Sequence, residues 1–405
     1  MKKSIQDKDL NDIKENQNIV HSNLDEKTED EKIKELEKLV GNSAEVTPQQ
    51  RKKKLLIRVF FICFNVIAIL LVLAYENIAD SDVVSFSVFI NALKTGYPYL
   101  IIAIGVYLLH LATEGFIFFT LIKESGYGSR YGLGFKVATL GRYYDNLTPW
   151  ATGGQPFQML YLYKHGIDLG TACSLPLVKF TIRVFVVNIA ILLLYIFGNV
   201  TGQVNTVIVV AAFVAVAFNF VLPVALVVFT INKEWGEKVV RLLVKLAYRI
   251  KFVKDFDKTL NKYTRYINDF LSASKYLSRH QKLLVIVAVL SLVFLFAIHS
   301  IPYFVIKSLG YQDVNILQII ILTLFTLQAA SYVPTPGAAG AAEGIFYVIF
   351  ASIVKGGYIF WAVLLWRLIV YYLPILIGIC IQILDAIKGK KPLKRLNKMD
   401  WHRNK

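Results

Sequence analysis

Several uninterrupted apolar runs, each longer than about 18 residues, constrain this chain more than any other feature. A helical run of that length matches the hydrocarbon thickness of a bilayer. Because lipid cannot hydrogen-bond to the backbone, such runs are expected to cross it as helices, which satisfy their own backbone groups. Hydrophobic residues make up 56% of the 405 residues, more than in an ordinary soluble domain. The sequence therefore predicts an all-α polytopic membrane protein.

The apolar runs predict about six full spans with both termini in the cytoplasm. Lysine and arginine concentrate in the cytoplasmic loops of membrane proteins. Bases from Arg51 to Lys54 precede the first run, and the residues after the last run are also basic. Four bases follow the second run, and they indicate another cytoplasmic flank: Lys123, Arg130, Lys136 and Arg142. We expect the full spans at residues 55–74, 97–122, 171–197, 206–230, 283–306 and 358–387.

The polarity of the chain predicts three parts. Residues 1–54 form a polar cytoplasmic tail, 55–387 a transmembrane domain, and 388–405 a basic cytoplasmic tail. Inside the domain, residues 231–282 are rich in lysine and arginine, and their apolar residues recur at helical spacing. This pattern predicts two cytoplasmic amphipathic helices that lie on the anionic inner leaflet or pack beneath the bundle. A solvated helical hairpin without a lipid role is the alternative.

The basic charge does not predict a nucleic-acid partner. The formal net charge is +17, but the bases cluster beside the apolar runs, where the orientation of the spans already explains them. The three cysteines lie inside apolar runs without a CxxC pair, and the six histidines lack ligand spacing. We therefore predict no metal and no cofactor. The sequence does not decide between a monomer and a homodimer.

The stretch 143–161, YYDNLTPWATGGQPFQMLY, interrupts the apolar pattern. Its prolines remove backbone donors, and its paired glycines allow a turn that other residues resist. A broken backbone at membrane depth is tolerated only where protein or a water-filled cavity covers it. Helices at 131–143 and 155–164 would each be too short to span. We predict a re-entrant hairpin that enters from the cytoplasm and lines a cavity.

A second break, at 333–340, resembles the first. Both contain the pattern TPxxxG, and the two copies lie 187 residues apart, at Thr148 and Thr335. Helices are expected on either side, at 316–332 and 341–354. For the count of spans to close, this hairpin must enter from the outer side. Opposed broken helices that meet near the midplane form the substrate site of many transporters. The residues predicted to break the two hairpins are Thr148, Pro149, Gly153, Gly154, Thr335, Pro336, Gly337 and Gly340.

Charged residues inside the apolar runs are candidates for binding a lipid headgroup. A charge at the bilayer centre costs at least about 2.5–3.5 kcal/mol, so it is expected to face a cavity or a partner. Lys179 and Arg183 share one helix face and could hold a phosphate, although Lys179 could instead extend to the inner interface. Arg367 lies too deep for that and is expected to be functional or ion-paired. Glu343 could bind substrate or cap its own helix.

Polar residues of the first hairpin complete the predicted site. Glu114 is a further acid within an apolar run and shares a helix face with His110. Neither residue belongs to the predicted site. The predicted headgroup-binding residues are Lys179, Arg183, Arg367, Glu343, Asp145, Asn146 and Gln155.

The two broken stretches resemble the signature regions of the lysylphosphatidylglycerol synthase/flippase transmembrane family. This family includes the membrane half of the bacterial multiple peptide resistance factor, and the resemblance covers about Leu55 to Lys388. This chain differs from the family pattern at two positions: Ala338 stands in place of a glycine, and Gln155 stands in place of a common glutamate. The matching residues are Asn146, Pro149, Gly153 and Gly154 in the first region and Pro336, Gly337, Gly340 and Glu343 in the second.

The resemblance implies movement of an anionic or aminoacylated phospholipid between the leaflets of a bacterial plasma membrane. It does not extend to the soluble aminoacyl-transferase half of the full-length factor, so we do not expect lysyl transfer by this chain alone. The sequence shows no hydrolase, metalloprotease or phosphate-loop motif. We therefore favour a lipid translocator. The alternatives are an enzyme that transfers lysine to phosphatidylglycerol and a scaffold subunit of a cell-envelope synthase.

Overall fold

A computed structural model of the chain describes residues 84–197, 206–249, 256–331, 333, 335, 338–355 and 357–387. Every regular element in these residues is helical, which confirms the predicted all-α class. The predicted first span, 55–74, and the two predicted tails lie outside the described residues. So do Pro336 and Gly337 of the second break.

Four helical segments in the described part of the chain are long and apolar enough to cross a membrane. They are α4 (Phe86–Ile122) with a π-helical turn at Lys123–Tyr127, α7 (Leu169–Phe197), α11 (Gln281–Ser308), and a last segment. The last segment consists of α14 (Ile359–Arg367), a π-helical turn (Leu368–Tyr372) and α15 (Leu373–Ile387). The predicted fourth span coincides with α8 (Thr206–Ile231).

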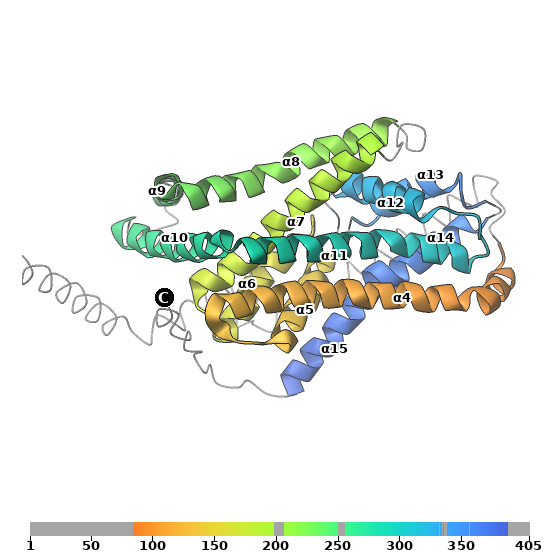
Figure 1. The fold of residues 1–405 in the computed structure, drawn as a ribbon, viewed down its shortest axis with the longest axis horizontal. Helices are drawn as coiled ribbons and strands as arrows, with labels where there is room; N and C mark the ends of the chain where they lie inside the picture. Colours follow the sequence, from red (N-terminus) through yellow and green to blue (C-terminus); the bar gives the residue numbers. More distant parts are fainter. Residues whose placement is uncertain are drawn as a thin grey trace, which may run out of the picture. The chain divides into compact units, whose positions relative to one another are not determined.

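The longest helix in the described part of the chain, α4, packs along α11, as Figure 1 shows. It begins at Phe86, well before the predicted start at Tyr97, because Pro98 lies inside the helix without ending it. Gly96 is a point of close contact between the two helices. A methyl group built on Gly96 would lie 1.9 Å from the backbone oxygen of Ser308 in α11. Only glycine fits at this point of contact.

We expect Gly96→Ala to lower the thermal stability of the purified protein by about 1–3 kcal/mol, the usual cost of overpacking. The methyl group would meet backbone atoms, so the helices must move apart. Gly105→Ala is the matched control because it lies on the same helix with nothing within 4 Å of the added methyl group. Equal melting temperatures for the two variants would contradict this packing.

The first predicted hairpin consists of α5 (Tyr131–Leu147) and α6 (Gly154–Lys164), which pack together. Its break is shorter than predicted because α5 continues to Leu147. The hairpin is attached to α15 at a polar junction. Lys136 of α5 forms an ion pair with Asp385, and the Tyr161 hydroxyl of α6 donates to the same carboxylate at 2.6 Å.

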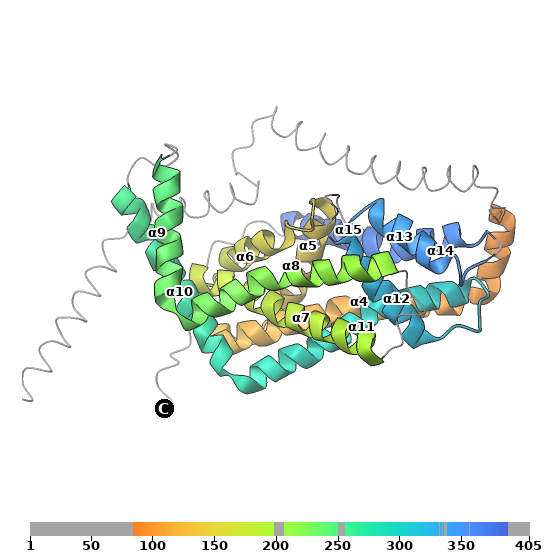
Figure 2. The same cartoon turned by 90° about the horizontal axis from the view of Figure 1, so that it is seen from above.

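The second predicted hairpin consists of α12 (Ile316–Ala330) and α13 (Ala341–Phe350). Each helix ends before its predicted limit. Figures 1 and 2 show α5 and α6 toward the carboxyl-terminal end of α4, and α13 and α14 toward its amino-terminal end. The first hairpin therefore lies toward one end of the long helices, and α13 of the second lies toward the other end.

The two amphipathic helices predicted between the fourth and fifth spans are present as α9 (Lys233–Arg249) and α10 (Phe256–Arg279). Figure 2 shows α9 turned across the direction of the long helices. The inner face of α10 is buried at Phe270, Leu271 and Leu277, and the helix packs against α7 and α9. At least one face of this pair is therefore covered by the helical bundle.

Candidate functional site

The two chain breaks line a single cavity of about 390 Å³. Asn146 near the end of α5 lines it together with Trp150 and Ala151 of the first break, and so do Ser331, Val333 and Ala338, which lie between α12 and α13. The remaining wall comes from α4, α5, α8, α11, α12 and the last apolar segment. Breaks that lie 187 residues apart in the sequence thus meet at one site.

Strained backbone is concentrated at this cavity. Within the described part of the chain, the non-glycine residues with positive φ are Trp150, Ala151 and Ala338, at 53°, 50° and 54°. All three line the cavity. An L-residue in this region is uncommon, and each such position costs on the order of 1–3 kcal/mol. Backbone strain of this kind clusters at functional sites, where surrounding structure maintains it.

The glycine pair of the first break has a different role from the predicted one. The sequence assigns the turn to Gly153 and Gly154, but Gly153 has an ordinary φ of −80°, and Gly154 begins α6. The left-handed turn is made by Trp150 and Ala151 instead. The glycines are required by crowding, because a methyl group on Gly154 would lie 2.3 Å from the Asp145 carboxylate.

Polar side chains of the first break hold the start of α6. The Thr148 hydroxyl accepts from the Gly153 amide at 2.8 Å, and Asp145 accepts from the Gly154 amide at 2.8 Å. The first amides of a helix have no partner inside it, and a nearby carboxylate also stabilises the positive end of its dipole. Asp145, a predicted headgroup ligand, thus serves as a helix cap.

Asn146 connects the first break to the last apolar segment. Its amide nitrogen donates to the backbone oxygen of Tyr371 at 3.1 Å. In return, the Tyr371 hydroxyl donates to the backbone oxygen of Asn146 at 3.0 Å. Both residues line the cavity, so this pair of hydrogen bonds fixes one of its walls.

The second break is held by Glu343 and Thr335. Gly340 adopts a φ of 85°, and its amide donates to the Glu343 carboxylate at 2.7 Å. The Thr335 hydroxyl donates to the backbone oxygen of Ala339 at 2.8 Å. Glu343 therefore caps α13, which is the second of the two roles that the sequence suggests for it. Its carboxylate also binds Arg367.

Arg367 is ion-paired, which was one of its two predicted roles. Its Nη2 lies 2.6 Å from Oε2 of Glu343, and both side chains are buried. Arg367 also lines the cavity and ends α14 where the π-helical turn begins. Pro374 follows that turn and cannot donate a backbone hydrogen bond. Single π turns in helices are frequent at functional sites.

A second group of charges surrounds Glu114 of α4, which is buried. The carboxylate of Glu114 lies 2.5 Å from Nζ of Lys179, 3.5 Å from Nη2 of Arg142 and 3.7 Å from Nη1 of Arg183. The two guanidinium groups also lie over the Phe294 ring, at 5.3 and 5.4 Å from its centroid. One carboxylate therefore stands against three cations. Of the three, only Arg142 lines the cavity.

The comparison with known proteins identifies a family. The family model described as the lysylphosphatidylglycerol synthase TM region matches residues 55–378 of the chain. The chain belongs to this family. A UPF0104 membrane protein from Archaeoglobus fulgidus is 24% identical over 272 residues, which cover 65% of this chain and 80% of the relative. The resemblance stated from the sequence is confirmed, and the chain is a membrane-embedded protein.

The lysylphosphatidylglycerol synthase TM region contains the whole cavity and both charge groups. Among the predicted headgroup residues, Asn146 and Arg367 line the cavity. Gln155 is half-buried in the first turn of α6 and does not line it. Lys179 and Arg183 are directed to Glu114, while Asp145 and Glu343 cap helices.

Sequence reasoning missed Arg142 and Glu114 as members of the site. The sequence places Arg142 among the flanking bases, yet in the structure it lies in the last turns of α5, beside Glu114 and on the cavity wall. The isolated acid at Glu114 was the available signal, because a carboxylate inside an apolar run requires a cationic partner. Its position in α4 did not show which cation would reach it.

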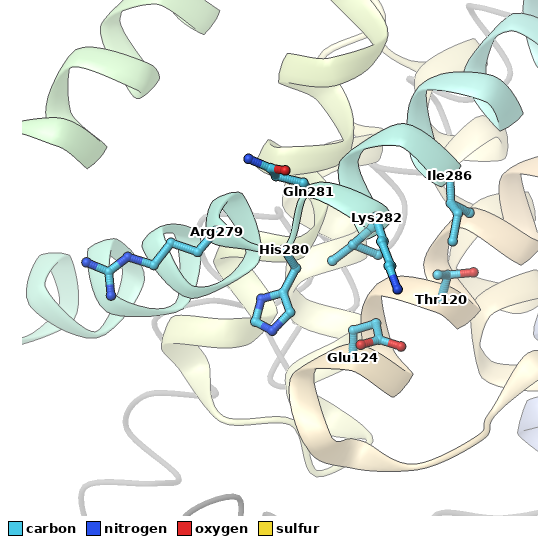
Figure 3. A pocket seen from close by; sticks show the side chains of 8 residues that line it. Thr120, Glu124, Arg279, His280, Gln281, Lys282 and Ile286 are labelled. Atoms are coloured by element: carbon cyan, nitrogen blue, oxygen red, sulfur yellow. The ribbon is translucent and has the colours of Figure 1, made fainter. Parts of the chain in front are cut away.

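A second pocket, of about 530 Å³, lies at the corner between α10 and α11 within the same TM region. Figure 3 shows the Lys282 side chain directed toward Glu124, and Arg279 directed away from it. Neither chain break reaches this pocket. None of its lining residues carries a buried polar atom without a partner, whereas several around the first cavity do. The cavity between the breaks is therefore the stronger candidate site.

Proposed function

We propose that this protein is a lipid translocator that moves an anionic phospholipid between leaflets through the cavity joining its two chain breaks. One observation carries the proposal: each half of the cavity supplies a guanidinium group. Arg142 stands beside the first break, and Arg367 is held by Glu343 behind the second. Discontinuous helices that meet at a polar site inside the membrane are a common design of transporters.

The charge on the cavity wall favours an anion. Arg142 and Arg367 line it, and no acidic residue of the described chain does. Arginine suits a phosphate because its planar fork can donate two parallel hydrogen bonds to two oxygens. Each guanidinium group is paired with a carboxylate, Arg142 with Glu114 and Arg367 with Glu343, and a guanidinium group has further N–H donors that a bound phosphate can use.

The size of the cavity favours transport of the headgroup with the acyl chains left in the bilayer. A volume of about 390 Å³ lies in the usual range for small-molecule pockets, about 300–1,000 Å³. It accommodates a phosphorylated headgroup and is too small for two acyl chains. The cavity therefore supports a path in which the headgroup crosses the protein while the chains stay in lipid.

The proposed membrane arrangement follows the predicted topology. In it, α5 and α6 form a re-entrant hairpin from the cytoplasm, and α12 and α13 form one from the outer side. The first hairpin lies toward the carboxyl-terminal end of α4, and α13 of the second lies toward its amino-terminal end. This placement supports entry of the two hairpins into the membrane from opposite sides. With both termini cytoplasmic, α9 and α10 would lie at the anionic inner leaflet of a bacterial plasma membrane.

The proposal is tested by Arg142→Gln. In proteoliposomes with fluorescent phosphatidylglycerol, we expect leaflet exchange to fall about 10- to 100-fold, the value of a hydrogen bond to a charged group. Arg142→Lys should retain part of the rate, because it keeps the charge but loses the fork. Lys123→Gln, at an exposed base beyond α4, is the control and should exchange lipid normally. Equal rates for Arg142→Gln and the control would contradict the proposal.

A further inference from the structure

One side of α9 is left uncovered by the described helices around it. The helix packs against α10 and α8, and Val244 on its packed side is 5% exposed. On the opposite side, Trp235, Leu242 and Leu246 are 55%, 56% and 50% exposed. These three positions are four and seven residues apart, so their side chains form one apolar stripe along the helix. Among the described side chains of α10, by contrast, no large apolar one is exposed.

Basic side chains flank this stripe. Lys245 and Arg249 are exposed, and they follow Leu242 by three and seven residues, which places them on the same side of the helix. The two acids of α9, Glu234 and Glu237, lie in its first two turns, and the rest of the helix carries no acid. The free face of α9 consists of Trp235, Leu242, Leu246, Lys245 and Arg249. It therefore joins an apolar centre to a basic edge.

The connection to α8 places this free face at the membrane surface. The apolar helix α8 ends at Ile231, and Asn232 is the one residue between it and α9. The side-chain oxygen of Asn232 accepts from the Glu234 amide at 3.1 Å, so the turn between the helices is tight. Figure 2 shows α9 running across the helices that are long enough to cross a membrane, and its axis therefore follows the plane of the bilayer. Trp235 then stands at the level of the headgroups, where tryptophan is enriched.

We propose that the free face of α9 binds the surface of an anionic lipid leaflet. The apolar stripe enters the boundary between headgroups and acyl chains, and Lys245 and Arg249 contact the lipid phosphates. A lipid surface covers an apolar stripe that water would leave exposed, and its negative charge complements the basic edge. That the leaflet is the inner one rests on the topology given with the proposed function. The binding itself rests on the exposure and charge of α9 and does not require lipid translocation.

Tryptophan quenching of the full-length protein in nanodiscs tests this binding. Brominated acyl chains quench a tryptophan that reaches them, so the discs contain brominated phosphatidylcholine, with or without phosphatidylglycerol. The difference between the wild type and Trp235→Phe isolates Trp235 from the other tryptophans. We expect Trp235 to be quenched more strongly in discs with phosphatidylglycerol, because the bases of α9 are attracted to its charge. High salt should reduce that increase because it screens surface charges.

Two double variants test the role of the charge. Lys245→Gln with Arg249→Gln should lower the ratio of bound to unbound α9 in phosphatidylglycerol discs by about fivefold for each base removed. Lys275→Gln with Arg279→Gln removes two exposed bases from α10 and should leave the quenching of Trp235 unchanged. All of these side chains are exposed, so the variants should melt at the wild-type temperature.

The quenching experiment also separates lipid from other occupants of the free face. If a second copy or a soluble protein covers this face, Trp235 will not be quenched by lipid, and the proposal is wrong. Equal quenching with and without phosphatidylglycerol, or in the two double variants, would overturn it as well. Lipid exchange is not the readout, so a failure here leaves the proposed translocator standing, and a failure of exchange leaves the binding of α9 standing.

Discussion

Arg367→Gln should abolish leaflet exchange of phosphatidylglycerol and destabilise the protein by about 3–5 kcal/mol, the usual cost of removing one member of a buried ion pair. Glu343 would keep a buried negative charge with the Gly340 amide still donating to it and no cation beside it among the described residues. The cavity would also lose one of its two guanidinium groups. Thermal unfolding in detergent and exchange in proteoliposomes measure the two effects.

A double variant separates the two contributions of Arg367. Glu343→Gln with Arg367→Gln removes both charges, so much of the stability should return, because neither side chain is then a lone buried ion. Exchange should remain lost because the phosphate still lacks its second arginine. If the double variant regains both stability and exchange, Arg367 serves only the fold, and the assignment of the phosphate site is wrong.

Glu114→Gln is expected to have an effect of similar size through a different cause. It would leave Lys179, Arg142 and Arg183 together without the carboxylate that they surround at 2.5, 3.5 and 3.7 Å. Removing one partner of such a buried group costs about 3–5 kcal/mol. We expect a clear fall in melting temperature, and slower exchange because Arg142 is no longer held at the cavity wall.

Two further variants control for this result. Glu124 lies just beyond the end of the same helix and is half-buried. Glu124→Gln should therefore change the melting temperature little. Glu114→Gln with Lys179→Met removes the closest cation together with the carboxylate, and should recover part of the loss, since contacting residues are energetically coupled. If the double variant loses more free energy of unfolding than the two single variants lose together, the pairing of Glu114 with Lys179 is not the source of the effect.

The sequence predicted the helices and their breaks well because both depend on local properties. A run of apolar residues forms a helix in lipid wherever it occurs, and both breaks were found from proline, glycine and polar residues inside such runs. The shared TPxxxG pattern also suggested that the breaks act together, and they do line one cavity. The limits of the helices were less accurate, since Pro98 was tolerated inside α4 and Tyr144 to Leu147 extended α5.

The partners of the charged residues could not be predicted from the sequence. Glu114 and Lys179 are 65 residues apart, and Arg367 and Glu343 lie on different helices. Which charges meet depends on how the helices rotate and cross, and many crossings would bury the same apolar area. For the same reason Lys179 and Arg183 were assigned to substrate, whereas the structure directs them to Glu114.

The sequence alone determined that this chain is helical, that it enters a membrane, and where its helices are interrupted, because length, apolarity and the backbone limits of proline act within a few residues of each other. Only the tertiary structure decided that the interruptions meet, that Trp150, Ala151 and Ala338 carry the strained turns, and that Arg142 and Arg367 share one cavity. Those outcomes depend on packing between distant helices, where a single contact such as Gly96 against Ser308 sets how closely two backbones approach.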